Sequence, residues 1–353
     1  MKLHVLEKTL AEQIKGRLQD VTPGVVVRAY QGGKLVVDLA VGDTWAYYDL
    51  ASLTKIIFTV QTLMLDFELG RWSRESKVGD FLSWFPHPET RIVDLLTHSA
   101  GLPWWMPFYQ DLDLSKTIPQ RREQLKGFLS QVTLEPKDVS VYSDLDFLLL
   151  GFILEEIHSK SLLEIWQETK KTFFEGTTLE FHEGNQKPSR AELYAPTEEC
   201  PWRKRLLQGE VHDENTWALG GVSTHAGLFG SIDDLGWYAL NLRASLQGIG
   251  RSPIRMKTAR LFTNRARHEG KGDWALGFML PTAGTASCGA YFGLASVGHT
   301  GFTGTSLWYD PKQDLIVALL SNRVLYGREN NAFRELRPVI HNWIVEGLRK
   351  SAY

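Results

Sequence analysis

The sequence contains little cysteine and no marked excess of charge of either sign. Only 2 of its 353 residues are cysteine, Cys200 and Cys288, which is too few for a disulfide framework or a thiolate metal site. One disulfide stays possible but is not implied. The formal net charge of −2 gives no reason to expect nucleic acid or an anionic membrane as a partner.

Long hydrophobic runs are also absent. The most apolar segment, Leu145 to Leu154, is shorter than the roughly 20 residues that span a bilayer, so we expect no membrane insertion. Residues 1–18 are charged throughout and lack the apolar stretch of a secretory signal. We therefore expect a cytoplasmic location.

The hydrophobic pattern predicts strands near both ends of the chain and helices in the middle. A chain of this length usually forms more than one lobe. Apolar spacing and turn residues predict strands at 25–30, 34–40, 294–297, 306–309 and 315–320. Helices are expected at 3–19, from Ser52 to about Gly70, and at 91–98, 120–131, 144–158, 233–246 and 332–350.

This order has a simple physical solution of the α/β class. One antiparallel sheet is built from both ends of the chain, and helices from both termini cover its face. Residues 1–70 and 215–353 then form a discontinuous α/β domain, and residues 71–214 form a mainly helical inserted lobe. We expect the active site in the groove between the two.

Ser52-Leu53-Thr54-Lys55 is the most informative motif of the chain. A helix places residues three apart on one face, so the hydroxyl of Ser52 and the amine of Lys55 would be neighbours. A serine becomes nucleophilic when a base takes its proton, and a lysine with a lowered pKa can be that base. The tetrapeptide also occurs by chance, so its meaning depends on the residues that follow.

Tyr142-Ser143-Asp144 stands about 90 residues later, just before the apolar helix. A tyrosine there can pass protons between the serine, the lysine and a leaving group. The structural alternative is that Ser143 or Asp144 only caps the helix. The two interpretations are compatible, because a helix cap would fix the loop that carries Tyr142.

His299-Thr300-Gly301 precedes a strand near the C-terminus. A glycine on an edge strand lets a substrate backbone approach and pair with that edge, and N–H groups here can hold an oxyanion together with that of Ser52. Thr300 and Thr303 are candidates for binding a substrate carboxylate. His225-Ala226-Gly227 has the same spacing, but we prefer 299–301 because a strand pair follows it directly.

These ordered motifs resemble the serine β-lactamase and penicillin-binding-protein superfamily, in particular its class C-like branch. The resemblance rests on YDLASLTK at 48–55, LLTHSAGLP at 95–103, YSDLDFLLLG at 142–151, GEVHDENTWALGGVSTHAGLFGSIDDL at 209–235 and GHTGFTG at 298–304. It covers nearly the whole chain. The fold that it implies, an α/β sandwich with an all-α insertion, agrees with the two-lobe prediction.

The resemblance also implies roles for individual residues. Ser52 would be the acylated nucleophile, Lys55 its general base and Tyr142 the proton shuttle. The N–H groups of Ser52 and Phe302 would form the oxyanion hole. His299 stands where many relatives have a lysine. The family site needs no cofactor.

Asp144 departs from the asparagine that is usual at its position. An ionised carboxylate only accepts hydrogen bonds, and beside Lys55 it favours the ammonium form over a neutral lysine base. This favours Tyr142 as the base, or an Asp144 that points away as a helix cap. On the second interpretation, Asp144→Asn is expected to keep at least partial activity.

Other polar residues have weaker claims to chemistry. The histidines and acids at 212–214 and His225 fit no standard zinc spacing, so we expect no metal site. His98 is expected to hydrogen-bond loop backbone. Trp104 and Trp105 follow it and are candidates for walling the cleft.

The sequence therefore predicts a serine hydrolase that works through an acyl-enzyme. The favoured substrates are amide bonds of peptidoglycan-derived peptides or muropeptides, cleaved by a D,D-peptidase, a D-aminopeptidase or a muramoyl-alanine amidase. β-Lactams are possible covalent ligands. The alternatives are a carboxylesterase acting on small esters and a non-catalytic penicillin-binding sensor or scaffold.

Overall fold

A five-stranded antiparallel sheet forms the base of the molecule. The computed structural model describes residues 3–135, 138–250 and 252–351. The strands lie in the order β2 (Lys34–Gly42), β1 (Gly24–Gln31), β10 (Leu315–Ser321), β9 (Ser306–Asp310) and β8 (Val297–Thr300). The N-terminal hairpin thus pairs with strands from the other end of the chain, with Val25 opposite Ser321. This confirms the predicted antiparallel sheet flanked by helices.

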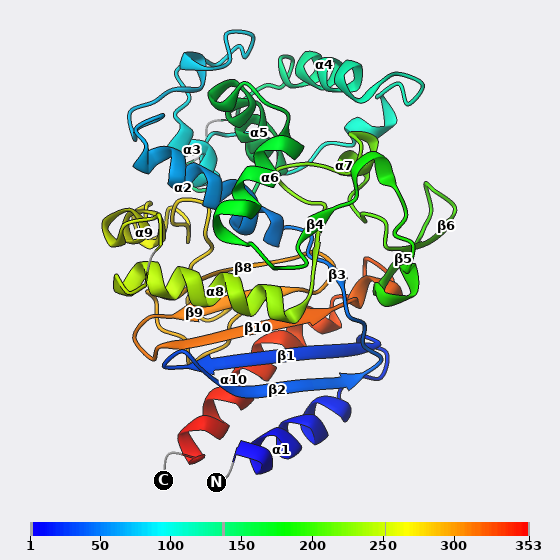
Figure 1. Cartoon of the computed structure of the whole chain (residues 1–353), viewed down its shortest axis with the longest axis vertical. Helices are drawn as coiled ribbons and strands as arrows, with labels where there is room; N and C mark the ends of the chain where they lie inside the picture. The colour runs from blue at the N-terminus through cyan, green and yellow to red at the C-terminus, as the bar shows by residue number, and fades with distance from the viewer. Residues whose placement is uncertain (1–2, 136–137, 251, 352–353) are drawn as a thin grey trace.

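Helices cover both faces of this sheet, which lies in the middle of the lower half of Figure 1. The helices α1 (Leu3–Lys15) and α10 (Ala332–Ser351) pack together on one face, and α8 (Ile232–Gln247) packs on the other. The alternation of side chains along β10 explains why all seven of its residues are buried. Val317 and Leu319 face α1 and α10, whereas Ile316 and Ala318 join the core below the upper lobe.

The upper lobe of Figure 1 is mainly helical. It contains α3 (Ile92–Leu96), α4 (Ile118–Leu129), α5 (Asp144–His158), α6 (Leu162–Phe173) and α7 (Glu214–Ala218). The central helix is α5, whose residues from Leu145 to Leu154 are all buried. A helix that is apolar all round must be enclosed on every side, so α5 anchors the lobe around itself.

Short strands and helices join the two lobes. A three-stranded sheet has the order β3 (Tyr48–Asp49), β7 (Leu228–Gly230) and β4 (Glu180–Phe181), and a hairpin pairs β5 (Pro196–Cys200) with β6 (Arg205–Gln208). Further helices are a π-helix at Lys55–Val60, α2 (Gln61–Glu68) and α9 (Met256–Thr263). The three-stranded sheet ties the segment before Ser52 to the segment after Gly227.

Most predicted elements are found within a few residues, and α5 has the predicted bounds. The strand predicted at 294–297 is wrong in position, because β8 begins at Val297 and runs through His299 to Thr300. The sequence did not predict the β5–β6 hairpin, α6 or α9. The division into domains at residues 70 and 215 stays a prediction.

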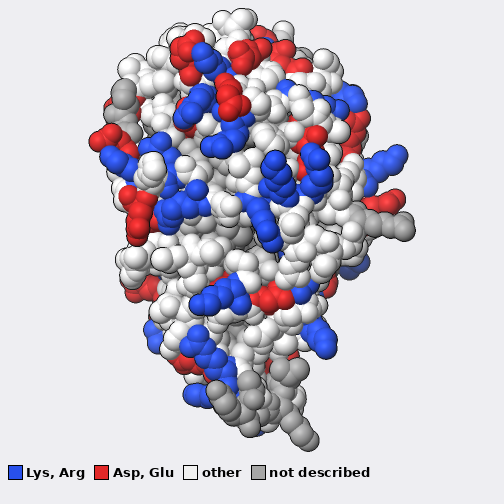
Figure 2. Space-filling model, turned by 90° about the vertical axis from the view of Figure 1, so that its left-hand side faces the viewer, with Lys and Arg blue, Asp and Glu red and all other residues white. Residues whose placement is uncertain are grey.

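The surface agrees with the near-neutral charge of the chain. On the face that Figure 2 shows, Lys and Arg side chains are interspersed with Asp and Glu side chains. Among the described residues, no helix combines the length and the apolar character that crossing a membrane requires.

Candidate active site

Ser52 lies at a sharp turn between β3 and the π-helix. The residue before it, Ala51, has a φ of 47°, in the left-handed region that residues with a side chain rarely adopt. Asp49 holds this turn, because its carboxylate accepts the N–H of Ala51 at 2.8 Å and the N–H of His212 at 2.7 Å. Such a strained turn presents the Ser52 side chain to the cleft, and strain of this kind is found at functional sites.

Lys55 is completely buried and contacts three oxygen atoms. Its Nζ lies 3.0 Å from Ser52 Oγ, 2.6 Å from Asp144 Oδ1 and 2.9 Å from the backbone oxygen of His225. Lys55 begins a π-helix rather than the predicted α-helix, and π-helical turns often occur at functional sites. The motif therefore brings the amine to the hydroxyl as predicted, with a carboxylate as an additional partner.

Tyr142 completes the contacts of the serine. Its hydroxyl lies 2.8 Å from Ser52 Oγ and 3.1 Å from Asp144 Oδ1. His98 holds the chain on both sides of Tyr142: the N–H of Val141 donates to its backbone oxygen and the N–H of Ser143 to its Nδ1. The prediction that His98 binds loop backbone is confirmed, and the loop that it binds is the one that carries Tyr142.

The capping interpretation of Asp144 is wrong. Ser143 is the N-cap of α5, since its hydroxyl accepts the N–H of Leu145 at 3.1 Å. The carboxylate of Asp144 instead points toward Lys55 and Tyr142 and is only 16 % exposed. A cap does fix the loop of Tyr142, as predicted, but the residue that provides it is Ser143.

Burial shifts the proton affinities of both groups that contact Ser52. Burial lowers the pKa of Lys55 below its ordinary value, although the neighbouring Asp144 acts in the opposite direction. Burial raises the pKa of Tyr142 well above its ordinary value, and the negative charge of Asp144 adds to the rise. At neutral pH, Tyr142 therefore carries its proton.

His299 is a neutral, buried histidine. Its Nδ1 donates to the backbone oxygen of Thr300 at 2.8 Å, which leaves Nε2 unprotonated and without a protein partner. Burial lowers the pKa of His299 to about 3, and the positive charge of Lys55 contributes. His299 thus brings no positive charge to the cleft.

Gly301 is required for close packing rather than for an open strand edge. A Cβ atom at this position would lie 2.0 Å from Thr305 Oγ1 and 2.7 Å from the backbone oxygen of Leu50. The glycine therefore lets the end of β8 lie directly against the turn before Ser52. On the outer edge of β8, Gly298 pairs with Met279, which takes part of the edge that was predicted to receive substrate.

Two threonine side chains hold the segment after β8 against the turn before Ser52. Thr303 Oγ1 donates to the backbone oxygen of Asp49 at 2.8 Å, and Thr305 Oγ1 donates to that of Leu50 at 3.0 Å. Thr303 is buried and engaged, so its predicted role in binding a substrate carboxylate is wrong. Thr300 does line the cleft.

The two predicted oxyanion-hole residues sit on the segments that these contacts join. Ser52 follows the turn that Asp49 holds, and Phe302 follows Gly301 directly. Arg323 fixes the second segment by donating to the backbone oxygen of Phe302 at 2.9 Å. The predicted oxyanion-hole residues are therefore held side by side, although they come from opposite ends of the chain.

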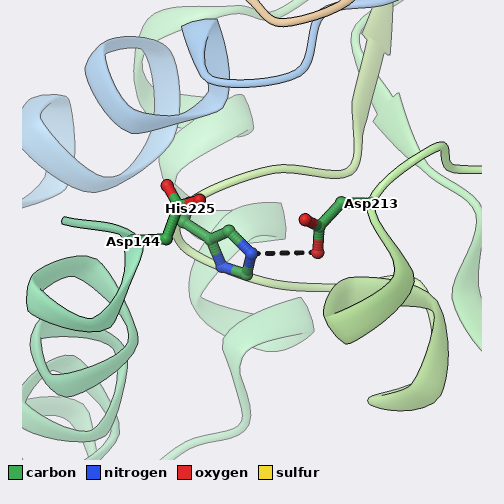
Figure 3. A group of neighbouring side chains, drawn as sticks. All are labelled: Asp144, Asp213 and His225. Atoms are coloured by element: carbon green, nitrogen blue, oxygen red, sulfur yellow. Dashed lines mark hydrogen bonds and ion pairs between the residues drawn. The ribbon is translucent and has the colours of Figure 1, made fainter. Parts of the chain in front are cut away.

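The second His-x-Gly segment also belongs to the site, which the sequence did not predict. Figure 3 shows His225 between Asp144 and Asp213. His225 Nε2 lies 3.0 Å from Asp213 Oδ1, and its backbone oxygen accepts from Lys55. The repeated His-x-Gly spacing was the available signal, but spacing alone could not show that both segments line the same cleft.

The carboxylate of Asp213 is ionised. Burial raises the pKa of Asp213, but the attraction of His225 and hydrogen bonds from His225 and Thr216 outweigh it, so the pKa falls well below its ordinary value. Asp213 also caps α7 by accepting the N–H of Thr216 at 2.7 Å. Side-chain atoms of Asp144, Asp213 and His225 lie within 4.8 Å of one another, a spacing that a metal ion can bridge. Because each already has protein partners, we assign these residues a hydrogen-bonding role.

The site opens into a cleft of about 730 Å³. Trp104 and Trp105 line it, as predicted, and Trp274 and Phe302 add further aromatic surface. Ser52 and Tyr142 also line this cleft, whereas Lys55 is buried behind them. A cleft of this volume can enclose a mid-sized organic group, since ligand clefts usually have volumes of this order. The other lining residues of the predicted set are Asp144, His299, Thr300 and Gly301.

The sequence is similar to a known protein family and to curated proteins over most of its length. A family model described as "Beta-lactamase" matches residues 6–337. The chain is 32% identical over 327 residues to the "N-acetylmuramyl-L-alanine amidase" of Bacillus subtilis, covering 84% of this chain and 72% of the relative. It is 31% identical over 331 residues to the "Putative D-alanyl-D-alanine carboxypeptidase" of Salmonella agona, covering 84% and 74%.

Solved structures share the fold at lower sequence identity. "EstCE1, a hydrolase with promiscuous acyltransferase activity" superposes with a TM-score of 0.69 and 19% identity, covering 96% of this chain and 98% of its own. The family match spans nearly the whole chain and includes all the residues that meet at Ser52. The chain therefore belongs to the beta-lactamase family of serine hydrolases.

Proposed function

We propose that this enzyme hydrolyses an amide bond of peptidoglycan-derived peptides or muropeptides through an acyl-enzyme on Ser52. The observation that carries the proposal is the contact of Ser52 Oγ with both Lys55 Nζ and Tyr142 Oη at the base of an aromatic cleft. A hydroxyl held between two proton-transfer groups is the arrangement that activates a serine nucleophile. The substrate class is supported by the names of the Bacillus and Salmonella relatives.

In the proposed reaction, Ser52 Oγ attacks the amide carbonyl carbon and the carbonyl oxygen becomes negative. The N–H groups of Ser52 and Phe302 stabilise that charge, and removing one such donor typically costs about 10²–10³ in rate. The amine leaves with a proton, and water then releases the acyl group from Ser52. His299, Thr300 and Asp144 face the substrate in the cleft.

The structure supports the three predicted activities equally. A D,D-peptidase, a D-aminopeptidase and a muramoyl-alanine amidase all cleave amide bonds, and the cleft is large enough for any of their acyl groups. We also propose a cytoplasmic location, which is supported by the free, buried state of both Cys200 and Cys288. A β-lactam fits the same chemistry as a covalent ligand of Ser52.

An esterase is the second candidate. The aromatic lining of the cleft by Trp104, Trp105 and Trp274 favours small hydrophobic esters, and the fold is shared with a hydrolase of promiscuous acyltransferase activity. Esters need less activation than amides because their leaving groups depart more readily. A non-catalytic sensor is the least favoured reading, since it has no need of Lys55 and Tyr142 on Ser52.

The test has two steps. The protein is treated with a fluorescent penicillin and with a fluorophosphonate, and mass spectrometry locates the adduct, with Ser52→Ala as the control. We expect an adduct on Ser52 with at least one probe, and no adduct from either probe would refute the acyl-enzyme mechanism. Turnover of muropeptides, D-Ala-D-Ala peptides and p-nitrophenyl esters then distinguishes the substrates, and labelling without turnover of any of them identifies a sensor.

A further inference from the structure

Four side chains around Ser52 form a closed ring of hydrogen bonds. Ser52 Oγ contacts Lys55 Nζ at 3.0 Å and Tyr142 Oη at 2.8 Å. Both of these groups also contact the same oxygen, Asp144 Oδ1, at 2.6 and 3.1 Å. Every path by which the serine proton can leave through these side chains therefore meets at one carboxylate oxygen.

We propose that the Asp144 carboxylate is the final acceptor of the Ser52 proton during acylation and returns that proton to the leaving amine. This inference rests on the proposed function, because it assigns the proton path of that same reaction. It makes Asp144 a catalytic residue, whereas its sequence position suggested only a substitute for asparagine. Lys55 and Tyr142 become the two relays between Ser52 and Asp144.

Tyr142 can relay a proton but cannot store the negative charge of a base. Its raised pKa means that a phenolate is not present at neutral pH. Tyr142 Oη can accept the proton of Ser52 only if its own proton leaves at the same time. The acceptor within reach of that proton is Asp144 Oδ1, 3.1 Å away.

Lys55 is subject to the same condition as Tyr142: it can accept the proton of Ser52 only after losing one of its own. As an ammonium group it has three N–H donors and no lone pair, and three oxygen atoms surround its Nζ. To take the proton of Ser52 it must first give one away. Asp144 Oδ1, at 2.6 Å, is the acceptor that can keep it, because the other partner is the backbone oxygen of His225.

Atoms and charges balance in the acylation step whether the proton travels through Tyr142 or through Lys55. A bond forms between Ser52 Oγ and the carbonyl carbon, and the carbonyl electron pair moves to its oxygen. The Ser52 proton passes to Tyr142 Oη while the tyrosine proton passes to Asp144 Oδ1. When the intermediate collapses, the C–N bond breaks, its electron pair goes to nitrogen, and the proton returns from Asp144 to that nitrogen. Water repeats the cycle in deacylation.

The first test is Asp144→Asn. An asparagine can place its amide oxygen where Oδ1 lies and still accept from Lys55 and Tyr142, but it cannot take up the proton. We expect the single-turnover acylation rate at pH 7 to fall by roughly 10²–10⁴-fold, the usual size of proton-transfer catalysis. Part of the rate should return at alkaline pH, where Lys55 loses its own proton. Asp43→Asn, which changes an exposed carboxylate outside the cleft, is the matched control.

Two further measurements do not depend on that variant. Asp144→Ala opens space beside a cleft, so added formate should restore its acylation rate several-fold, whereas acetamide should not. In the wild-type enzyme, acylation rates measured in mixtures of H₂O and D₂O should fit two protons in flight. A fit to one proton would overturn the relay even if neither variant folds.

The outcomes separate this inference from the proposed function. If Ser52 of the wild-type enzyme forms no adduct with either probe, the proposed function has failed. If Ser52 is labelled and a folded Asp144→Asn variant acylates at the wild-type rate at pH 7, the function stands and the role of Asp144 is refuted. That second result would match the partial activity expected from the sequence alone.

Discussion

Two pairs of a histidine and an aspartate support the residues that contact Ser52, and the proton lies on the aspartate in one pair and on the histidine in the other. His98 Nδ1 lies 2.8 Å from Asp146 Oδ2 and supports Tyr142. His225 Nε2 lies 3.0 Å from Asp213 Oδ1, and the backbone of His225 supports Lys55. The aspartate that supports Tyr142 through His98 is therefore protonated, whereas the aspartate that supports Lys55 through His225 is ionised.

The surroundings explain the difference. His98 Nδ1 accepts the N–H of Ser143, so the proton of the pair must come from Asp146. Burial raises the pKa of Asp146 well above its ordinary value, and burial lowers that of His98 well below it. Asp213 instead accepts the N–H of Thr216, which favours its ionised form. Backbone hydrogen bonds thus decide which partner carries the proton.

The largest expected effect is the loss of the ionised carboxylate in Asp213→Asn. Removing a charged hydrogen-bond partner typically costs up to about 3 kcal/mol, and here His225 would be left without its carboxylate. Urea unfolding at pH 7 should show this loss, with a lower rate of Ser52 labelling because Lys55 loses its support. An unchanged midpoint would mean that Asp213 is not ionised in the folded protein.

A smaller effect is expected from His98→Ala. This change removes the acceptor of the Ser143 N–H and the contact with the Tyr142 ring, whose centroid lies 4.8 Å away. A misplaced relay should lower kcat by about 10- to 100-fold with little change in KM. Steady-state kinetics check it, and a parallel rise in KM would show that the cleft itself has been disturbed.

The pH dependence of stability should have opposite signs for the two carboxylates. The folded-state pKa of Asp213 is depressed, so its contribution is present above the unfolded pKa of about 3.8 and is lost as pH falls. The folded-state pKa of Asp146 is raised, so its contribution is present at low pH and is lost as pH rises through about 4 and above. Unfolding of Asp213→Asn and Asp146→Asn measured from about pH 2 to 7 should therefore show a deficit that widens for the first variant mainly up to about pH 4. For the second variant, the deficit should shrink as the pH rises above about 4.

The smallest expected effect is that of Asp146→Asn at pH 7. An amide can donate to His98 Nδ1 as the protonated carboxyl does, so His98 keeps the position from which it holds the loop of Tyr142. We expect a change in stability of less than about 1 kcal/mol and a kcat within a few-fold of the wild type. A loss as large as that of Asp213→Asn would refute the neutral assignment.

The sequence predicted that Ser52, Lys55 and Tyr142 meet, and it predicted the antiparallel sheet. Each motif was found from residues that are neighbours in the chain, and α5 follows from an apolar segment that begins after Ser143. The meeting of the motifs and the pairing of strands from both ends of the chain were predicted from the order of the elements and from the family resemblance.

Other features depend on contacts between distant segments, which periodicity does not encode. The β5–β6 hairpin contains few apolar residues, so its pattern was weak. His225 reaches Lys55 because the segment before β7 packs beside the π-helix, where Thr59 Oγ1 also donates to the backbone oxygen of Thr224. The effect of Asp144 on Lys55 was predicted from charge alone, but whether the carboxylate faced the lysine or solvent required the structure.

The central claim is that the proton of Ser52 ends on Asp144, and single-turnover acylation of Asp144→Asn at pH 7 tests it most directly. The account predicts a rate roughly 10²–10⁴-fold below that of the wild type in a folded protein, with partial recovery at alkaline pH. A folded variant with the wild-type rate and the wild-type pH profile would contradict it.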